Sequence, residues 1–339
     1  MSFFLKVVLF SLSSMPMLLF PKFGAGRSVA DSVADRALKI MFWNVENYFD
    51  TFDNPETADD EFTPAGERHW SWKRFVVKRN SIAKTIIAAG AGNLPIIVAL
   101  AEVENRFVLE QLVKNTPLAR SGYSVIHRDS PDGRGIDVGL IYRKDRFKVL
   151  NTRYYRVDFE NSRETTRLIL YVKGVIDLLD TLHLFVNHWP SKLGGELKSF
   201  PKRSAAAGTL RMACDSVFST NYKANIILTG DFNDTPDSKL FSLFDDFINL
   251  SYYHYLSGGG SIKFRGEWEL IDLFFVSPNL VDRDEPIYCT GNSVEYRNLP
   301  FLTEPDREYT GYKPKRVYNG PAYNGGVSDH LPAIIKIFK

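Results

Sequence analysis

Short apolar runs that end abruptly in polar side chains recur along this chain, and they constrain its fold more than any other feature. Four of them are ALKIMFWNVEN from residue 37, LPIIVALAEVEN from residue 94, TLHLFVNHWPS from residue 181 and ANIILTGDFNDTP from residue 224. Three more runs, IDVGLIYR, LILYVKGVI and ELIDLFFVSP, share this character. Runs of this length, rich in β-branched and aromatic residues, are typical of strands buried on both faces. The sequence therefore predicts a core of β-strands.

Two helical patterns lie between the strands. Residues 71–90 place Phe75, Ile82 and Ile86 on one face and reach Gly90, a residue type that often ends helices, and residues 202–219 form the second pattern. Strands alone dominate residues 123–188, which excludes a simple repeat of strand and helix. We therefore predict the α/β class, with two mixed β-sheets packed face to face and helices outside. No linker divides the chain, so residues 38–339 are predicted to form a single domain.

The first thirty residues are predicted to be a secretory signal peptide. One early Lys6 precedes an apolar stretch from about Val7 to Phe20, and Ser28-Val29-Ala30 fits the small-x-small rule for cleavage between residues 25 and 30. Pro16 interrupts the apolar stretch, which is short for a spanning helix, so a membrane anchor is the less favoured alternative. We expect a secreted or periplasmic protein with no membrane span after signal removal.

Charge and cysteine content exclude some classes of protein without selecting one. The formal net charge of +2 permits a polyanionic substrate but does not by itself indicate one. The only cysteines, Cys214 and Cys289, are too few for a disulfide-stapled fold or a cysteine-based zinc site. An oxidising compartment would permit a disulfide between them, and the sequence leaves open whether they pair.

Polar side chains at the strand ends are the candidate functional residues, because strand ends and their loops gather side chains from distant sequence positions. Carboxylates and amides suit a hard divalent cation, and histidines suit proton transfer or contact with a phosphoryl oxygen. Each also has a structural interpretation, such as an Asx turn for GDFND or a packed loop histidine. Asp272 differs, since a carboxylate within an apolar strand requires a partner. The strand-end residues are Asn44, Glu46, Glu102, His188, Asp231, Asn233, Asp329 and His330.

The ordered set of motifs WNVEN, LAEVEN, DVGLIYR, VNHWPS, TGDFND, LIDLFFVS and SDHLP resembles the endonuclease/exonuclease/phosphatase superfamily, which has the DNase I-like fold. The resemblance covers residues 40–337 and is similar in its loops to bacterial secreted nuclease-like members. It implies a four-layer α/β/β/α sandwich and a divalent-metal-dependent phosphodiester hydrolase. The implied ion is Mg²⁺, with Mn²⁺ or Ca²⁺ as alternatives.

The resemblance also implies a role for each matching residue. Two positions depart from the family pattern: Glu46 stands where many members have another residue, and Ala101 precedes Glu102 where the family has Gln. The implied metal site comprises Asn44, Glu46, Glu102 and Asp329. The implied catalytic residues are Asp231 and Asn233, which position the attacking water, His330 and His188, which contact the scissile phosphate, and Asp272, which orients His330.

The substrate is less constrained, because superfamily members cleave DNA, RNA, sphingomyelin and phosphoinositides. Aromatic and basic residues alternate in residues 68–79, and basic loops supply Arg134, Lys192 and Arg203 as candidate phosphate contacts. These features favour a monomeric endonuclease acting on nucleic acid with no stable protein partner, although a solvated basic surface is the structural alternative.

The alternative within enzymes is a lipid or inositol-phosphate phosphoesterase that would use FINLSYYHYLSGGG as a membrane-contacting loop, although that segment reads more simply as a strand and a turn. A non-catalytic binding module is disfavoured because the Asp-His pair and the GDFN residues, which degenerate members lose, are all retained.

Overall fold

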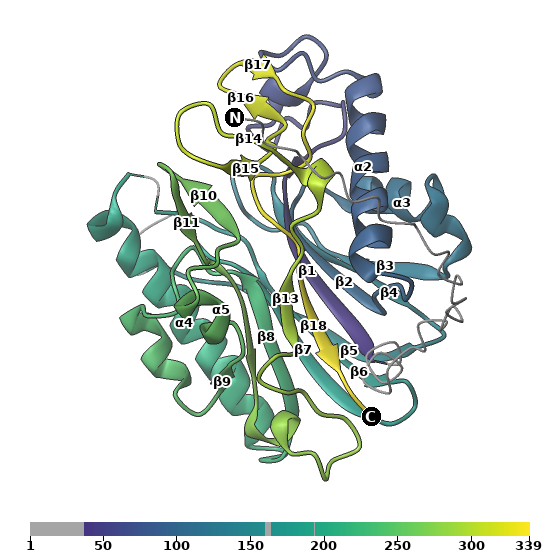
Figure 1. The fold of residues 1–339 in the computed structure, drawn as a ribbon, viewed down its shortest axis with the longest axis vertical. Coiled ribbons are helices and arrows are strands. Elements are labelled where there is room, and N and C mark those ends of the chain that lie inside the picture. The colour runs from purple at the N-terminus through teal and green to yellow at the C-terminus, as the bar shows by residue number, and fades with distance from the viewer. Residues whose placement is uncertain (1–36, 160–163, 193) are drawn as a thin grey trace, which may run out of the picture. The chain divides into compact units, whose positions relative to one another are not determined.

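Two six-stranded β-sheets, stacked face to face, form the centre of the domain (Figure 1). The computed structural model describes residues 37–159, 164–192 and 194–339, so the predicted signal peptide lies outside the described residues. The first sheet has the spatial order β13 (Val294–Tyr296), β18 (Ala333–Ile337), β1 (Leu38–Tyr48), β2 (Ile97–Val103), β4 (Asp137–Arg143) and β3 (Tyr123–His127). The second sheet has the order β5 (Phe147–Tyr155), β6 (Ile169–Ile176), β7 (Asp180–His188), β8 (Asn225–Asp231), β12 (Asp272–Val276) and β9 (Ile248–Asn249).

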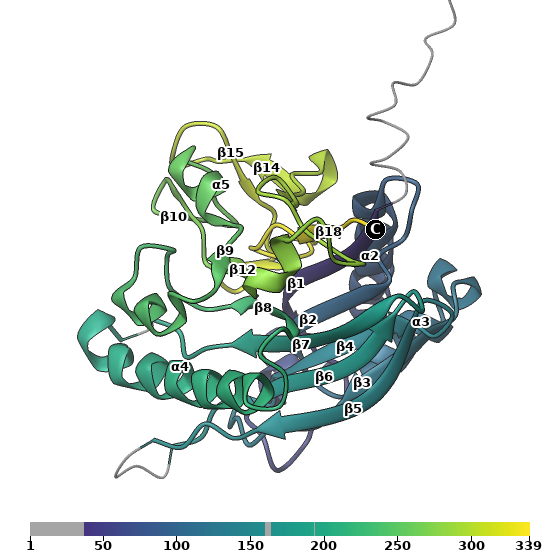
Figure 2. The same cartoon turned by 90° about the horizontal axis from the view of Figure 1, so that it is seen from below.

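Helices cover the outer faces of both sheets. Figure 1 shows α2 (Trp72–Gly90) and α3 (Arg106–Lys114) beside the first sheet, and Figure 2 shows α4 (Glu196–Phe218) along the second. A short α5 (Tyr252–Leu256) and the 3₁₀ turns η1 (Asp60–Phe62), η2 (Pro117–Arg120), η3 (Lys239–Phe244), η4 (Pro278–Val281) and η5 (Pro300–Leu302) lie in connections. The predicted four-layer α/β/β/α sandwich is confirmed.

The alternation of side chains in β1 explains how one strand serves two layers. Met41 and Trp43 pack with α2 and α3, whereas Ile40 and Phe42 pack between the sheets against residues of the second sheet. Successive strand side chains point to opposite faces, so a strand covered on both sides must be apolar throughout. Complete burial of each such side chain stabilises the fold by about 1.5–3 kcal/mol.

Two parallel strand pairs determine where the polar strand ends meet. β1 pairs in parallel with β2, and β7 pairs in parallel with β8; α2 and α4 provide the crossovers that parallel pairing requires. β12 and β18 run antiparallel to β8 and β1, so both begin where those strands end. The strand ends that carry the predicted site residues therefore lie at the same end of the sheets.

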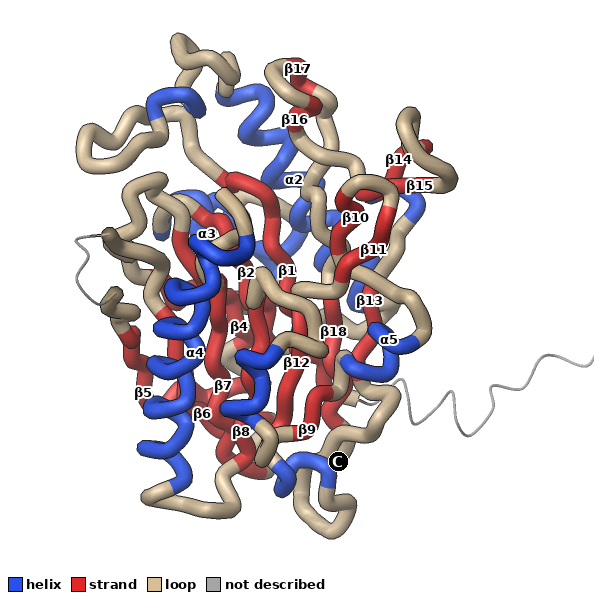
Figure 3. Tube along the Cα trace, turned by 90° about the vertical axis from the view of Figure 1, so that its left-hand side faces the viewer, coloured by secondary structure: helices blue, strands red, loops and turns tan. Residues whose placement is uncertain are grey.

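Three hairpins extend from the connections after β9 and β13. They are β10 (Ile262–Phe264) with β11 (Glu267–Glu269), β14 (Thr303–Pro305) with β15 (Tyr312–Pro314), and β16 (Tyr318–Asn319) with β17 (Ala322–Tyr323). Figure 3 shows β16 and β17 beyond the end of β1, with β14–β15 and β10–β11 to the side of that end of the domain. They are too short to have produced a strand pattern in the sequence.

The helix boundaries refine the sequence prediction. Ser71 caps α2 by accepting a hydrogen bond from the backbone N–H of Arg74, and α2 ends at Gly90, as predicted. By contrast, α4 begins at Glu196, ahead of the predicted residue 202, and includes Pro201 near its start. The strand predicted after Phe247 is present as β9, but the short helix α5 follows it where a simple turn was predicted. No helix in the described ranges combines the length and apolarity needed to cross a membrane.

Cys214 and Cys289 are both buried and both free thiols, which answers the question that the sequence left open. Cys214 packs between α4 and the second sheet, whereas Cys289 packs between the two sheets.

Candidate active site

Asn44 joins the two sheets at the centre of the site. Its side-chain amide donates to Oε1 of Glu102 at 3.2 Å and to Oδ2 of Asp231 at 3.0 Å, and its Oδ1 accepts from the backbone N–H of Glu46. The end of β1 in the first sheet is thereby tied to the end of β8 in the second. Glu102 and Asp231 lie 58 and 187 positions after Asn44 in the sequence, and both contact its side chain.

Glu102 has the features expected of a ligand for a hard cation. Its backbone adopts a left-handed conformation at the end of β2, with φ of 60°, and its Oε2 accepts from the backbone N–H of Asn47 at 2.9 Å. Its side chain is 16% exposed, whereas the neighbouring Asp231 is 3% exposed. An anchored, partly accessible carboxylate that shares the amide of Asn44 with a second carboxylate, Asp231, fits the oxygen donors that Mg²⁺ prefers.

His330 and Asp272 form a buried charged pair. Nδ1 of His330 lies 2.7 Å from Oδ2 of Asp272, while the backbone carbonyl of His330 accepts from the indole N–H of Trp43. Burial opposes a charge on His330, but the carboxylates of Asp272, Asp329 and Asp231 raise its pKa well above the ordinary value. The imidazole is therefore protonated near neutral pH, and its Nε2 N–H is available to an anion.

His188, unlike His330, is held in its uncharged form. Burial, followed by the charges of Arg167, Arg134 and His330, lowers its pKa well below the ordinary value. Its Nε2 lies 3.6 Å from Oδ2 of Asp231 and 3.9 Å from Oε1 of Glu102, and its buried Nδ1 has no hydrogen-bond partner within the described part of the chain. Two imidazoles with different charge states thus face the same carboxylate.

Asp231 lies between these histidines at the end of β8. Its Oδ1 accepts from the backbone N–H of Asn233 at 2.9 Å, and its Oδ2 lies 3.8 Å from Nε2 of His330. Burial raises its pKa to about 7, with the charge of His330 acting against the rise. A carboxyl group poised near neutrality suits proton transfer to or from water.

Gly230 allows β8 to approach β7 closely enough to form this arrangement. Its φ is +154°, and a Cβ at this position would lie 2.2 Å from the backbone oxygen of Asn187. The register places His188 opposite Asp231 across the same pair of strands. A side chain at position 230 would push the two residues apart.

Asn233 also braces the loop that follows β8. Its backbone has φ of 51°, and its side-chain amide donates to the carbonyl oxygen of Trp189 at 2.9 Å. That carbonyl also accepts from the guanidinium of Arg167. Asn233 therefore connects the loops after β7 and β8.

Arg316 is a site residue that sequence reasoning missed. Its guanidinium contacts Glu46 at 2.8 Å and Asp329 at 3.0 Å from the segment between β15 and β16. Both oxygens of Glu46 are thereby occupied, by Arg316 and by the backbone N–H of Val317. Glu46 holds the 315–317 segment in this structure, and its role as a metal ligand remains a prediction. The dense basic run KPKR at 313–316 was the available signal.

Lys78 lies beside Glu46, and its predicted position on a basic face of the helix is wrong. Residues Lys78 and Arg79 were expected on a basic face of α2, but both are buried. The ammonium of Lys78 donates to the backbone oxygens of Glu46 and Val327, and burial lowers its pKa to about 8. Arg74 is likewise engaged, because its guanidinium lies 4.3 Å from the ring centre of Tyr323.

The three predicted phosphate contacts differ in placement. Arg134 is exposed, and its charge lowers the pKa of His188, so it borders the site. Lys192 lies 3.0 Å from Asp234 and is partly exposed. Arg203 is wrong as a substrate contact: it is fully buried in α4, where Asp234, Ser199 and Glu196 surround its guanidinium.

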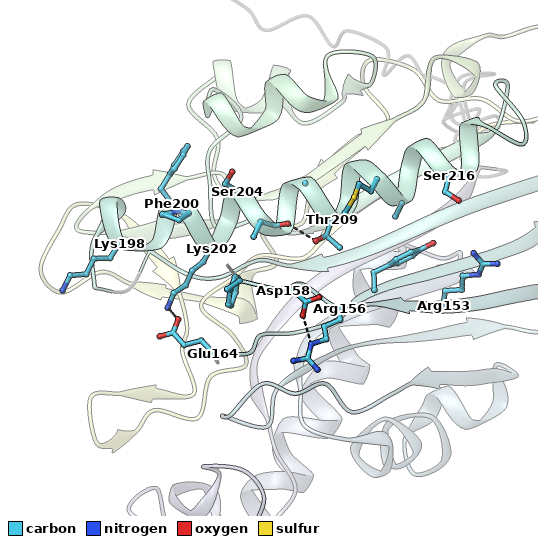
Figure 4. A pocket seen from close by; sticks show the side chains of 17 residues that line it. Arg153, Arg156, Asp158, Glu164, Lys198, Phe200, Lys202, Ser204, Thr209 and Ser216 are labelled. Atoms are coloured by element: carbon cyan, nitrogen blue, oxygen red, sulfur yellow. Dashed lines mark hydrogen bonds and ion pairs between the residues drawn. The ribbon is translucent and has the colours of Figure 1, made fainter. Parts of the chain in front are cut away.

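A cavity of about 1100 Å³ lies apart from the acid cluster, between α4 and the end of β5 (Figure 4). None of the predicted site residues lines it. Two ion pairs, Arg156 with Asp158 and Lys202 with Glu164, occupy its walls. Lys198 and Lys202 lie on the wall that α4 forms.

The comparisons with known proteins agree with this arrangement. Residues 39–339 match the Endonuclease/Exonuclease/phosphatase family. Among proteins with curated descriptions, none matches the chain in sequence.

Several solved structures share the fold at low identity. The human Nocturnin catalytic domain with bound sulfate anion is 16% identical with a TM-score of 0.55, covering 89% of this chain and 95% of that one. D. rerio TDP2 complexed with single strand DNA product is 14% identical with a TM-score of 0.55, covering 90% and 100%. A functionally unknown conserved protein from Enterococcus faecalis V583 is 14% identical with a TM-score of 0.57, covering 88% and 99%. The family match spans nearly all of the described domain, and the chain therefore belongs to the endonuclease/exonuclease/phosphatase family.

Proposed function

We propose that this protein is a divalent-metal-dependent phosphodiesterase, and specifically a secreted or periplasmic endonuclease that cleaves nucleic acid. The observation that carries the proposal is the meeting of Glu102, Asp231 and His330 around Asn44, with His330 held protonated by Asp272. Members of this family are hydrolases of phosphate esters, and this cluster supplies the groups that such a reaction requires.

Glu102 would hold the metal ion, with Asp329 and Asn44 beside it. When bound, a divalent ion neutralises charge on the phosphate and polarises the leaving oxygen. The fit rests on the donor set, since the accessible Glu102 carboxylate is already oriented by Asn44 and Asn47. Mg²⁺ is the ion we propose, with Mn²⁺ or Ca²⁺ as substitutes.

Asp231 is positioned to orient and deprotonate the attacking water. It is buried, its pKa is about 7, and Asn233 and Asn44 fix both of its oxygens. His330 donates its Nε2 proton in a hydrogen bond to a phosphoryl oxygen, where charge grows in the transition state. Neutral His188 can donate or accept a hydrogen bond on the same phosphate without adding charge.

Nucleic acid is proposed as the substrate because cations surround the acids at the surface. Arg316 has a side chain that is 52% exposed, and that of Arg134 is 55% exposed. Exposed guanidinium groups beside the site can position a polyanionic backbone. The fold neighbour from D. rerio is described with a DNA product, which supports this choice of substrate class.

A lipid or inositol-phosphate substrate is the second candidate, and one observation favours it. The side chains of Tyr253 and Leu256 on α5 are 72% and 66% exposed, which would suit contact with a membrane surface. The hydroxyl of Tyr296 connects the start of this helix to the site, since it donates to the backbone oxygen of Asp272 and shares a hydrogen bond with the hydroxyl of Ser251.

One comparison of substrates tests the proposal. The chain without residues 1–30 is incubated with covalently closed plasmid DNA, RNA, sphingomyelin vesicles and bis-p-nitrophenyl phosphate, each with Mg²⁺ or with EDTA. We expect plasmid nicking and hydrolysis of the small diester with Mg²⁺ only, and loss of both in His330→Ala. Cleavage of lipid but not DNA would establish the second candidate, and activity that survives EDTA would overturn the metal-dependent mechanism.

A further inference from the structure

A small cationic pocket lies directly beside the candidate active site. It has a volume of about 430 Å³ and is lined mainly by charged and polar residues. We call it the Arg68–Arg316 pocket. Its charged residues are Arg68, Lys263, Lys313, Arg316, Glu46 and Glu61. Four cations and two carboxylates thus line the pocket, and two further carboxylates outside the lining, Asp306 and Asp329, pair with three of these cations.

The pocket shares a wall with the metal-binding acids. Glu46 and Asn47 belong to its lining, and the backbone N–H of Asn47 donates to Oε2 of Glu102 at 2.9 Å. Arg316 also lines the pocket and contacts Asp329 at 3.0 Å. A group in the pocket therefore lies next to whatever Glu102 and Asp329 hold.

Two of the cations retain the capacity to bind a ligand. Asp306 is the carboxylate shared by Lys263, at 3.1 Å, and Lys313, at 3.8 Å. One carboxylate cannot fully neutralise two ammonium groups, and Lys313 is the more loosely held and the more exposed of them. Arg316 has five N–H donors, and its side chain is half exposed although it contacts two carboxylates.

Other cations frame the pocket rather than bind its occupant. The guanidinium of Arg68 pairs with Glu61, donates to the backbone oxygen of Gly320 and lies 5.0 Å from the ring centre of Tyr318. Lys263 donates to the backbone oxygen of Thr310. The Lys263 contact joins the β10–β11 hairpin to the turn between β14 and β15, and the Arg68 contacts join the β16–β17 hairpin to the segment that precedes α2.

We propose that the Arg68–Arg316 pocket binds a second phosphate group of the substrate, adjacent to the phosphate that is cleaved. The inference rests on the proposed function and specifies its substrate: a molecule with two neighbouring phosphates, as in a nucleic acid strand. The charged lining suits a phosphate and disfavours an acyl chain or a bare nucleobase, which would leave the cations desolvated without a partner. Charge-assisted hydrogen bonds from Lys313 and Arg316 supply the recognition.

Small substrates that differ by one phosphate test the proposal. Hydrolysis of the dinucleotide dTpdT is compared with that of pdTpdT and dTpdTp, each at saturating Mg²⁺. We expect kcat/KM for one of the phosphorylated dinucleotides to exceed that for dTpdT about tenfold, the effect of a hydrogen bond to a charged group. Lys313→Ala should abolish this preference while leaving dTpdT hydrolysis unchanged, and Lys148→Ala, on the exposed surface of β5, should change neither.

The outcomes separate this inference from the proposed function. Equal rates for all three dinucleotides, or a preference that survives in Lys313→Ala, overturn the pocket assignment. If only the lipids show a difference, with phosphatidylinositol 4-phosphate hydrolysed faster than phosphatidylinositol, the second-phosphate site is supported and is assigned to a lipid headgroup. Failure to hydrolyse bis-p-nitrophenyl phosphate, which has one phosphate, counts against the proposed function alone. In that case the affinity for thymidine 3′,5′-diphosphate, measured by calorimetry, still tests the pocket. An affinity about tenfold weaker in Lys313→Ala supports the assignment, and an unchanged affinity overturns it.

Discussion

Replacing Asp272 with Asn tests whether one buried side chain sets the charge of another. Asp272 is 1% exposed, and its Oδ2 lies 2.7 Å from Nδ1 of His330. Burial lowers the pKa of His330, whereas the charges of Asp272, Asp329 and Asp231 raise it well above its ordinary value. Because the net effect is a pKa well above the ordinary value, His330 keeps its proton at neutral pH.

The substitution preserves the shape of the side chain and removes its charge. Opposite charges about 4 Å apart attract by about 4 kcal/mol at an effective dielectric constant of about 20. Only about 1.4 kcal/mol is needed to change a protonation ratio tenfold. Without the charge of Asp272, only Asp329 and Asp231 still oppose the effect of burial, so the pKa of His330 falls. We therefore expect kcat/KM at pH 7.5 to fall by at least about 100-fold, the scale of a positioned acid–base group.

The assay is the pH dependence of bis-p-nitrophenyl phosphate hydrolysis from pH 5 to pH 9 with saturating Mg²⁺. The ratio of wild-type to Asp272→Asn activity should narrow toward acidic pH, because protons from solvent restore the charge of His330. Asp245→Asn, an exposed carboxylate, is the matched control and should leave the profile unchanged. A ratio that stays constant with pH, or a variant that retains most of its activity, would refute the reasoning.

Three further predictions concern the metal site, the helix α4 and the thiols. Glu102→Gln should lower activity at least about 100-fold and weaken Mn²⁺ binding measured by calorimetry. Glu110→Gln, on the exposed face of α3, is the control and should change neither quantity. Unchanged Mn²⁺ affinity in Glu102→Gln would exclude Glu102 as a ligand. Arg203→Met should lower the free energy of unfolding in urea by about 3 kcal/mol, because it breaks a buried charge network. Arg156→Met breaks an exposed ion pair and should lower it by less than about 1 kcal/mol. Unaltered stability of Arg203→Met, together with weaker plasmid binding, would restore Arg203 as a substrate contact. Cys214 and Cys289 should resist a thiol reagent in the folded protein and react with it in urea. Burial raises the pKa of both thiols, that of Cys289 to about 12. Rapid labelling of the native protein would contradict their burial.

The sequence predicted the layers of the fold because apolar strands leave a strong pattern. The runs ending at Asn44, Glu102 and Asp231 are buried on both faces, so each is continuous enough to be recognised. The prediction placed the start of α4 at residue 202, although the helix begins at Glu196 with Pro201 in its second turn. The short α3 and the three hairpins depend on tertiary contacts that no local pattern records.

The candidate site was only partly predictable, for a related reason. Residues on strand ends could be identified because strands fix their direction, and Asn44 does join Glu102 and Asp231. Arg316 and Lys78 could not be assigned from their neighbours in sequence. Lys78 looked like a solvated cation on α2, but the helix turns this side chain inward to backbone oxygens of Glu46 and Val327. Whether a lysine is buried is decided by the partner that the fold brings to it.

The adjacency of the first and last strands of the domain has a consequence for the cell that makes the protein. β1 lies between β2 and β18, and Asp329 and His330 directly precede β18. Until β18 is present, one edge of β1 lacks its neighbouring strand. The first sheet and the candidate site, which includes Asp329 and His330, can therefore be completed only after most of the domain has been synthesised.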